Sequence, residues 1–223
     1  MTIEAIASAV YNNVVGGLTG ISANPKISLE QLQDECVAEK NHILREYLLK
    51  GIMNFEELFL SINCVELNCD YMSKCCDLQV GEKALHFEIP PILQIPGANT
   101  IKFIGSIDRK HKFIVYTDES YRYHQYRKRG SNKPYVYVDT AVNANGNIDC
   151  YVFNAPMAKY LSVTALFQDP RRLLEWSCCA TDSDVYLDCG LISTEIIKRM
   201  TEKYLRYYRQ LASPVLPNNQ MPK

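Results

Sequence analysis

Hydrophobic periodicity changes twice along the 223 residues of this chain, from helical spacing to strand-like runs and back to helical spacing. Apolar residues recur every three or four positions in a surface helix, whereas in strands they alternate or form short continuous runs. A segment cannot satisfy both patterns at once. The pattern therefore predicts helices from the two ends of the sequence and a β region between them.

The N-terminal part predicts two amphipathic helices followed by a short third one. Apolar residues recur at helical spacing over residues 3–15, and Gly16 and Gly17 end the pattern. Ser28 begins a capping box that opens a longer helix, and Gly51 stops it. The segment "FEELFLSI" then predicts the short third helix.

The middle of the chain predicts antiparallel strands. Its segments are rich in β-branched and aromatic residues, have the length of strands and are separated by turn residues. The dipeptide Asn145-Gly146 favours a type I′ turn. We therefore expect a β-hairpin in which this turn joins "PYVYVDTAV" to "NIDCYVFN".

Helical spacing returns after Asp169-Pro170, first in "RRLLEWSCCA" and then in a last helix that Ser193 caps. The final residues contain three Pro and two Asn and too few apolar side chains to pack alone. The predicted fold class is α+β. We expect an N-terminal helical part over residues 1–80, an inserted β region with a basic hairpin over 81–168, C-terminal helices completing the helical body over 169–212, and a flexible tail over 213–223.

A stretch rich in tyrosine and basic residues, "YRYHQYRKRGSNKPYVYVD" over residues 121–139, allows two interpretations. In a nucleic-acid site, the tyrosines would stack on bases while the cations neutralise phosphates. In a β-hairpin, Tyr121–Tyr126 and Tyr135–Asp139 would be the arms, and the residues between them an exposed basic tip. We favour the hairpin, because the aromatic residues lie on the arms and the cations at the tip.

The formal net charge of −1 gives the chain as a whole none of the basic character that nucleic-acid-binding proteins carry. The cations are instead concentrated, since residues 109–133 contain eight Lys or Arg against two acidic residues. We expect Arg127, Lys128 and Arg129 at the tip to contact an acidic surface of a neighbouring protein. A nucleic-acid-binding module remains the alternative.

Sequence motifs of the common enzyme classes are absent: there is no G-x-S-x-G, P-loop, G-x-G-x-x-G or H-E-x-x-H. The nine cysteines are an odd number, and the cluster Cys64, Cys69, Cys75 and Cys76 lacks both C-x2-C pairs and a following His. We expect buried, reduced thiols, no metal, no cofactor and no catalysis. A cysteine- or metal-dependent enzyme stays open as a further alternative.

No window approaches 18 uncharged apolar residues, which argues against a membrane span. The N-terminus contains Glu4 and lacks the basic region of a secretory signal. We expect a soluble protein that is made in a cytoplasm and has no membrane partner.

Two parts of the chain resemble head-to-tail connector proteins of short-tailed bacteriophages, and more narrowly the adaptor or ring proteins of crAss-like phages. The resemblance lies in "ISLEQLQDECVAEKNHILREYLLKG", "INCVELNCDYMSKCC" and "LISTEIIKRMTEKYLRYYRQLASPVLPNNQ", roughly residues 25–80 and 185–220. In that group an opening helix pair, a segment of the pattern C-E/D-x-x-S-K-C-C and a terminal helix with a Pro/Asn tail recur.

The resemblance implies a structural role without catalysis. Such proteins form a ring, commonly of twelve copies, that joins the portal to downstream tail proteins in the virion, and DNA passes through the ring as cargo. We accordingly expect the last helix and the tail to contact neighbouring proteins, at Tyr204, Tyr208, Pro214, Pro217, Asn218 and Asn219.

Overall fold

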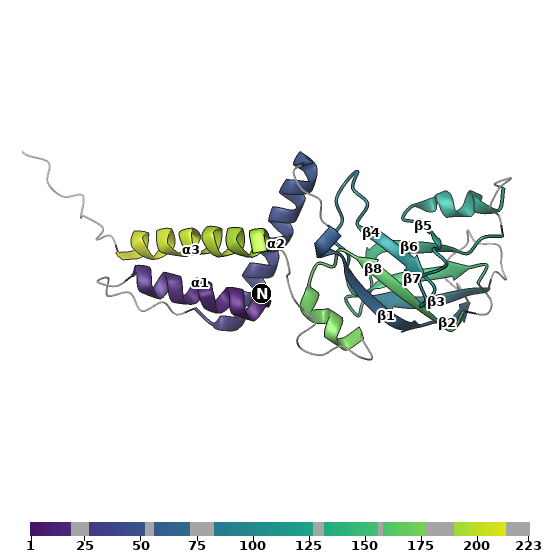
Figure 1. Ribbon diagram of the computed structural model, residues 1–223, viewed down its shortest axis with the longest axis horizontal. Coiled ribbons are helices and arrows are strands. Elements are labelled where there is room, and N and C mark those ends of the chain that lie inside the picture. The colour runs from purple at the N-terminus through teal and green to yellow at the C-terminus, as the bar shows by residue number, and fades with distance from the viewer. Residues whose placement is uncertain are drawn as a thin grey trace, which may run out of the picture. The chain divides into compact units, whose positions relative to one another are not determined.

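The computed structural model describes residues 1–18, 27–51, 56–71, 83–126, 132–155, 158–176 and 190–212. The chain divides into two compact units. The helical unit combines Met1–Glu46 with Tyr186–Lys223, and the β unit is Tyr47–Val185 (Figure 1). The predicted α+β class, with a β region inserted between helices from the two ends of the sequence, is confirmed.

Three helices build the helical unit: α1 (Ile3–Gly17), α2 (Leu29–Lys50, which runs on past the end of the unit) and α3 (Gly190–Ala212). The predicted cap at Ser28 is present, since Ser28 Oγ accepts from the Gln31 N–H at 3.1 Å, and Thr2 Oγ1 caps α1 by accepting from the Ala5 N–H at 3.1 Å. The predicted cap at Ser193 is wrong, because α3 begins at Gly190 and Ser193 is a buried residue within it. Among the described residues, no helix is both long and apolar enough to cross a lipid bilayer.

The helices α1 and α3 lie side by side and run in the same direction (Figure 1). Each presents one apolar stripe to the interior, at positions three or four residues apart. The buried residues are Ile3, Ile6, Ala7, Val10 and Val14 on α1, and Ile192, Ile196, Met200, Tyr204 and Tyr208 on α3.

Ion pairs join α2 to α3. Arg199 on α3 contacts Glu46 Oε2 at 3.1 Å and Glu39 Oε1 at 3.6 Å, both on α2. Further along the two helices, Lys203 Nζ donates to Glu35 Oε2 at 2.7 Å. Partial burial alone would raise the pKa of Glu35, but the hydrogen bond from Lys203 and its positive charge outweigh burial and lower it.

The β unit contains two sheets. One has the strand order β1-β8-β4 and is antiparallel throughout, formed by Leu60–Glu66, Tyr160–Ala165 and Ile101–Gly105. The other has the order β2-β3-β7-β6-β5, formed by Asn68–Tyr71, Lys83–Ile89, Ile148–Phe153, Tyr135–Val142 and Ile114–Tyr116. Its pairs are antiparallel except for β5 and β6, which run parallel.

A single apolar core lies between the inner faces of the two sheets. Side chains alternate along a strand, so every second residue of β3, β6 and β7 faces this core and the next faces outward. Inner residues of both sheets are almost fully buried, among them Ile62, Ile104, Leu161, Val163, Phe87, Val136 and Val152. The two sheets therefore form a β-sandwich.

The predicted boundaries were wrong on both sides of the β region. Where a short third helix was predicted, the structure has a 3-10 turn, Glu56–Leu58, followed by β1, because Ile62 and Val65 pair with β8 and fill the core. The C-terminal helical segment at 169–176 is the 3-10 helix η3 (Pro170–Trp176), and Leu173 anchors it in the β core. Both segments therefore belong to the β unit.

The predicted basic hairpin is also wrong. Residues Glu119–Tyr126 form a 3-10 helix, η2, and not a strand. No arm could pair with β6, because β7 occupies one of its edges and β5 the other. The crossover between the parallel strands β5 and β6 passes through η2 and continues outside the described residues.

The hairpin predicted at Asn145-Gly146 is confirmed, since it joins β6 to antiparallel β7. Its turn is not type I′, which would need positive φ at both residues. Only Gly146 has positive φ, +76°, and its N–H donates to the carbonyl of Asn143 at 3.0 Å. This is a three-residue loop, a type I turn followed by a glycine in the left-handed region.

Gly105 is expected to tolerate no side chain. A Cβ atom built there would lie 2.0 Å from the backbone oxygen of His111, so Gly105→Ala must displace the turn after β4. We expect the free energy of unfolding of the β unit to fall by about 1–3 kcal/mol. Urea unfolding followed by the fluorescence of Trp176, the single tryptophan, measures it.

Gly16→Ala is the matched control, because a Cβ there meets no atom within 4 Å. It lies in α1 and should leave the Trp176 transition unchanged. A Gly105→Ala protein that unfolds at the wild-type urea concentration would contradict the close approach.

Candidate functional site

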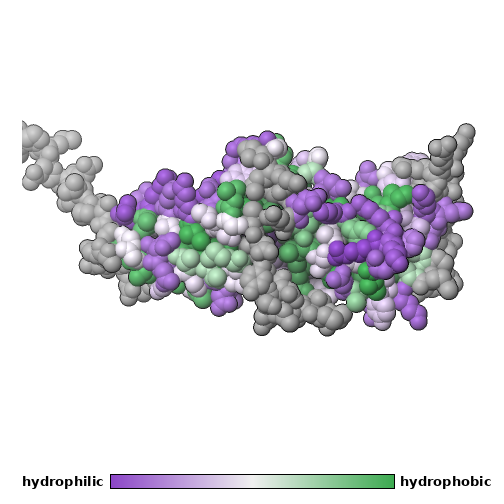
Figure 2. Space-filling model, in the orientation of Figure 1, coloured by the Kyte–Doolittle hydropathy of each residue, from purple (hydrophilic) through white to green (hydrophobic). Residues whose placement is uncertain are grey.

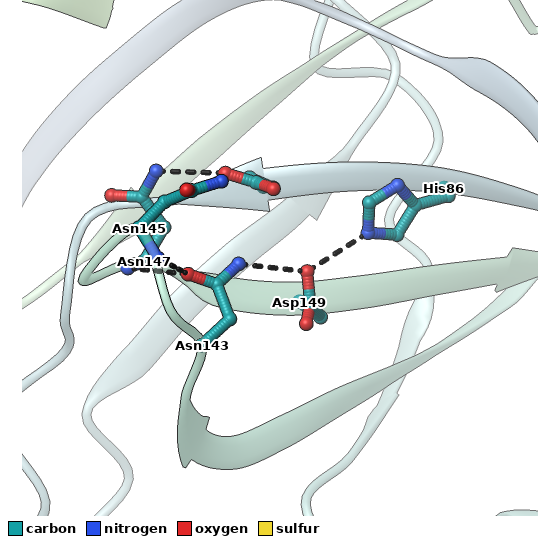
Figure 3. A network of polar contacts seen from close by, with 6 residues as sticks. His86, Asn143, Asn145, Asn147 and Asp149 are labelled. Atoms are coloured by element: carbon teal, nitrogen blue, oxygen red, sulfur yellow. Dashed lines mark hydrogen bonds and ion pairs between the residues drawn. The ribbon is translucent and has the colours of Figure 1, made fainter. Parts of the chain in front are cut away.

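A network of polar side chains surrounds the turn between β6 and β7 (Figure 3). Asp149 on β7 accepts hydrogen bonds from His86 Nε2 on β3 at 3.0 Å and from Asn143 Nδ2 at 3.1 Å. Asn143 Oδ1 accepts from the backbone N–H groups of Asn145 and Asn147, both at 3.0 Å. One buried carboxylate thus links two strands to the turn that follows β6.

A second branch of the network reaches η3. Asn147 Nδ2 donates to Glu88 Oε2 on β3, and Asn147 Oδ1 accepts from Arg172 Nη2, both at 2.7 Å. Arg172 Nη1 also donates to the carbonyl oxygen of Gly146 at 2.7 Å. The Arg172 guanidinium therefore binds the turn through two hydrogen bonds. Asn147 is only 8 % exposed, and both the NH2 group and the carbonyl oxygen of its side chain have hydrogen-bond partners.

The pair of His86 and Asp149 has the geometry that a general base uses. The site around it is closed, however, since Asp149 is only 8 % exposed and the His86 ring lies against Tyr151 with the ring centroids 5.2 Å apart. The neighbouring thiol of Cys150 lies on the opposite face of β7, within the core. This arrangement positions the turn by saturating its polar groups.

Beyond His86, aromatic rings pack against one another on the outer face of the five-stranded sheet. Tyr151 and Tyr137 stack with centroids 6.4 Å apart, and Tyr137 stacks on Tyr121 at 4.3 Å. Tyr121 comes from η2 and is only 4 % exposed. The ring proposed to stack on a base or to form a hairpin arm is therefore part of a buried aromatic cluster, while Tyr123 on the same helix is 68 % exposed.

The helical unit carries an open groove of about 480 Å³ beside α1. It is lined by the polar Ser8 and Asn12 and by three larger apolar side chains, Tyr11 on α1, Ile27 just before α2 and Leu29 at the start of α2. Tyr11 and Leu29 are 37 % and 42 % exposed, and Val15, one turn after Tyr11, is 40 % exposed. Thus α1 has apolar side chains on two sides, a buried stripe and an exposed one.

Apolar residues also interrupt the hydrophilic surface over α1 and α3 on the face that Figure 2 shows. On α3, Leu191 is 58 % and Tyr207 is 54 % exposed. Large contiguous apolar surfaces commonly mark protein contacts, whereas apolar side chains exposed singly, as Leu191 and Tyr207 are, are ordinary. We define the groove residues together with Val15 as the α1 apolar surface.

The residues predicted to contact neighbours fall into two groups. Tyr204 and Tyr208 are 8 % and 9 % exposed and stack with ring centroids 6.4 Å apart, so they belong to the interior of the helical unit. The tyrosine that α3 exposes is Tyr207. The other predicted contacts lie outside the described residues: Arg127, Lys128, Arg129, Pro214, Pro217, Asn218 and Asn219.

Two of the described thiols are buried and one is exposed. Burial, helped by the charges of Glu35 and Glu39, raises the pKa of Cys36 to about 11. Burial raises the pKa of Cys150 well above its ordinary value. Within the described ranges, no three His, Cys, Asp or Glu side chains gather as metal ligands would, and Cys75 and Cys76 of the cysteine cluster lie outside those ranges.

Sequence reasoning missed the polar network, whose members are Glu88, Asn143, Asn147, Asp149 and Arg172 beside His86. The available signal was "NANGNID", in which Asn and Asp residues flank a turn and continue into an apolar strand. We interpreted it only as a turn. Nothing in the local sequence connects it to Arg172, which is 26 residues away from Gly146 in the chain.

Comparisons with known proteins do not assign this arrangement to a family. No protein-family model matches the sequence, and no curated protein matches it significantly.

Asp149→Ala is expected to destabilise the β unit. The substitution leaves the His86 ring N–H and the Asn143 amide without their shared acceptor, which costs about 1–3 kcal/mol. Urea unfolding monitored at Trp176 gives the change. Asp139→Ala is the control, because Asp139 is partly exposed and accepts from the Ala141 N–H at 3.0 Å, and an equal loss in both variants would contradict the network's role.

Alkylation should distinguish the three described thiols. Cys64 is exposed, whereas the raised pKa and burial of Cys36 and Cys150 keep them protonated and inaccessible at neutral pH. Brief treatment of the native protein with iodoacetamide, followed by peptide mass spectrometry, should label Cys64 and spare the other two. The urea-unfolded protein serves as control and should be labelled at all three. Rapid native labelling of Cys36 or Cys150 would instead favour a reactive-thiol enzyme.

Proposed function

We propose that this chain is a structural protein of a virion, a subunit of an oligomeric ring in the head-to-tail connector of a short-tailed phage. The observation that carries the proposal is the α1 apolar surface, where Tyr11, Val15 and Leu29 are exposed although other residues of the same helices are buried in the core. The resemblance of the helical segments to connector proteins supports the same conclusion.

A repeated contact between copies would bury this surface. A ring closes when one patch of a subunit meets a different patch of its neighbour and the rotation returns to the start. The helical unit offers the α1 apolar surface and, separately from each other, the exposed Leu191 near the start of α3 and Tyr207 near its end. A head-to-tail arrangement would bury the α1 apolar surface against a different part of the neighbouring copy, such as the end of α3 that carries Tyr207.

The ring that we propose, of twelve copies as is common in such connectors, joins the portal protein to downstream ring proteins of the tail. DNA passes through it as cargo. The formal net charge of −1 suits this role, because a wall rich in cations would bind phosphates and slow transit. In this role the chain performs no catalysis and needs no cofactor, and its function depends on the shape of its contact surfaces.

Assembly of the purified full chain tests the proposal. We expect mass photometry and negative-stain microscopy to show rings in equilibrium with smaller species. Tyr11→Asp places a charge in the α1 apolar surface and should abolish the rings. Tyr123→Asp is the control, since Tyr123 is 68 % exposed on η2 of the β unit, and it should leave the rings intact.

A protein that stays monomeric as its concentration rises, or rings that both variants lose equally, would contradict a contact made through the α1 apolar surface. Circular dichroism of the variants shows whether each has folded. This check separates the loss of an interface from the loss of structure.

One observation favours the nucleic-acid-binding alternative. Arg109, Lys110 and Lys112 are all exposed in the segment between β4 and β5. Binding to DNA that weakens steeply with salt, and that is lost when these three residues become Ser, would favour this function over the ring.

A further inference from the structure

The β unit is open along one side, where the two sheets end in β4 and β5. The sheets are joined there by a short connection, in which the Phe113 N–H donates to the Ile104 carbonyl at 2.8 Å. Beyond Phe113 the strands part, because β4 pairs with β8 in one sheet and β5 with β6 in the other.

A groove of about 770 Å³ lies where these two edges part. Segments 95–101 and 112–117 line it. Its most buried lining residues are apolar, since Ile95, Ile101 and Phe113 are each only 6 % or 7 % exposed, while Ile114 and Val115 are half-buried. The groove therefore combines an apolar floor with two strand edges.

The edge of β5 is oriented for pairing. The Ile114 N–H donates to the Pro134 carbonyl at 3.2 Å, so the backbone groups of Ile114 point toward β6. Backbone N–H and C=O groups of successive strand residues point to opposite sides in the plane of the sheet. Those of Val115 therefore point away from β6, toward the side on which the groove lies. An exposed strand edge of this kind is a template for a further strand.

The charge at the groove is positive. Lys112 is the one charged residue among those that line it, and Arg109 and Lys110 lie exposed in the adjoining turn. Asp108, which contacts Lys110 and Ser106, and Asp118, which accepts from Ser120, lie nearby but do not line the groove. A carboxylate on a bound segment would thus complement Lys112.

We propose that this groove binds an extended, acidic peptide segment of a partner protein by strand addition. The segment pairs its backbone with Val115 of β5, places alternate apolar side chains on Ile95, Ile101 and Phe113, and directs a carboxylate to Lys112. This site is separate from the α1 apolar surface and does not depend on ring assembly.

The test uses the full chain and an eight-residue synthetic peptide that alternates valine with glutamate and threonine. Fluorescence anisotropy of the labelled peptide should show saturable binding, and hydrogen exchange of the protein should slow at Val115. Lys112→Glu should weaken binding roughly fivefold, since it replaces an attractive pair with a repulsive one. A peptide with lysine in place of glutamate should bind Lys112→Glu better than the wild type.

Lys159→Glu is the matched control, because Lys159 is exposed and is not among the groove residues, and it should bind as the wild type does. Val115→Pro removes the N–H that strand addition requires and should abolish binding. Its unfolding transition at Trp176 shows whether the β unit remains folded. If it does not fold, the Lys112 variants and the exchange data decide.

Four results would overturn the proposal. The first is no binding at peptide concentrations of about 1 mM, the range of the weakest specific contacts. The second is equal weakening by Lys112→Glu and Lys159→Glu. The third is displacement of the peptide by an oligonucleotide, which would assign the groove to nucleic acid. The fourth is self-association that Val115→Pro abolishes, which would assign it to a second copy of this chain.

Discussion

The β unit depends on the apolar layer between its two sheets, and this layer determines what each strand can present to its outer face. Asp149 and Cys150 are neighbours on β7, yet one lies in a polar network and the other in the core. A shift of the strand by one residue would exchange them, burying a carboxylate among apolar side chains. The polar network can exist only because the core sets this register.

The network in turn holds the β6–β7 turn and the helix η3 together at the edge of the β unit. Two adjacent residues of the short helix η3 have different roles. Leu173 is buried in the core, and Arg172 donates a hydrogen bond to Asn147 in the turn. The His86–Asp149 pair satisfies buried groups in this arrangement. The polar side chains of the network close a turn over a packed sheet, and the Asn143 and Asn147 amides and the Asp149 carboxylate all have hydrogen-bond partners.

The helical unit follows a different principle. Its core is built by all three helices, since α2 buries Leu32, Cys36, Ile43 and Leu44, and ion pairs from Arg199 and Lys203 add to the contact between α2 and α3. The apolar side chains that remain outside, such as Tyr11 and Leu29, are not needed for that core. These exposed apolar side chains thus belong to the helical unit, whereas the edge groove with its basic residue belongs to the β unit.

Local sequence determined the three long helices, the cap at Ser28 and the hairpin at Gly146, because periodicity, capping and turn chemistry act within a few residues. It did not determine that residues 56–71 form strands, since β1 exists only by pairing with β8 about a hundred positions later. Tertiary structure also decided the fate of the tyrosine-rich stretch. Tyr121 could have been an arm of a hairpin, but β5 and β7 already occupied both edges of β6, and its ring was left to pack on Tyr137. Which segment pairs with each strand edge depends on segments far apart in the sequence, so a local sequence pattern cannot predict it.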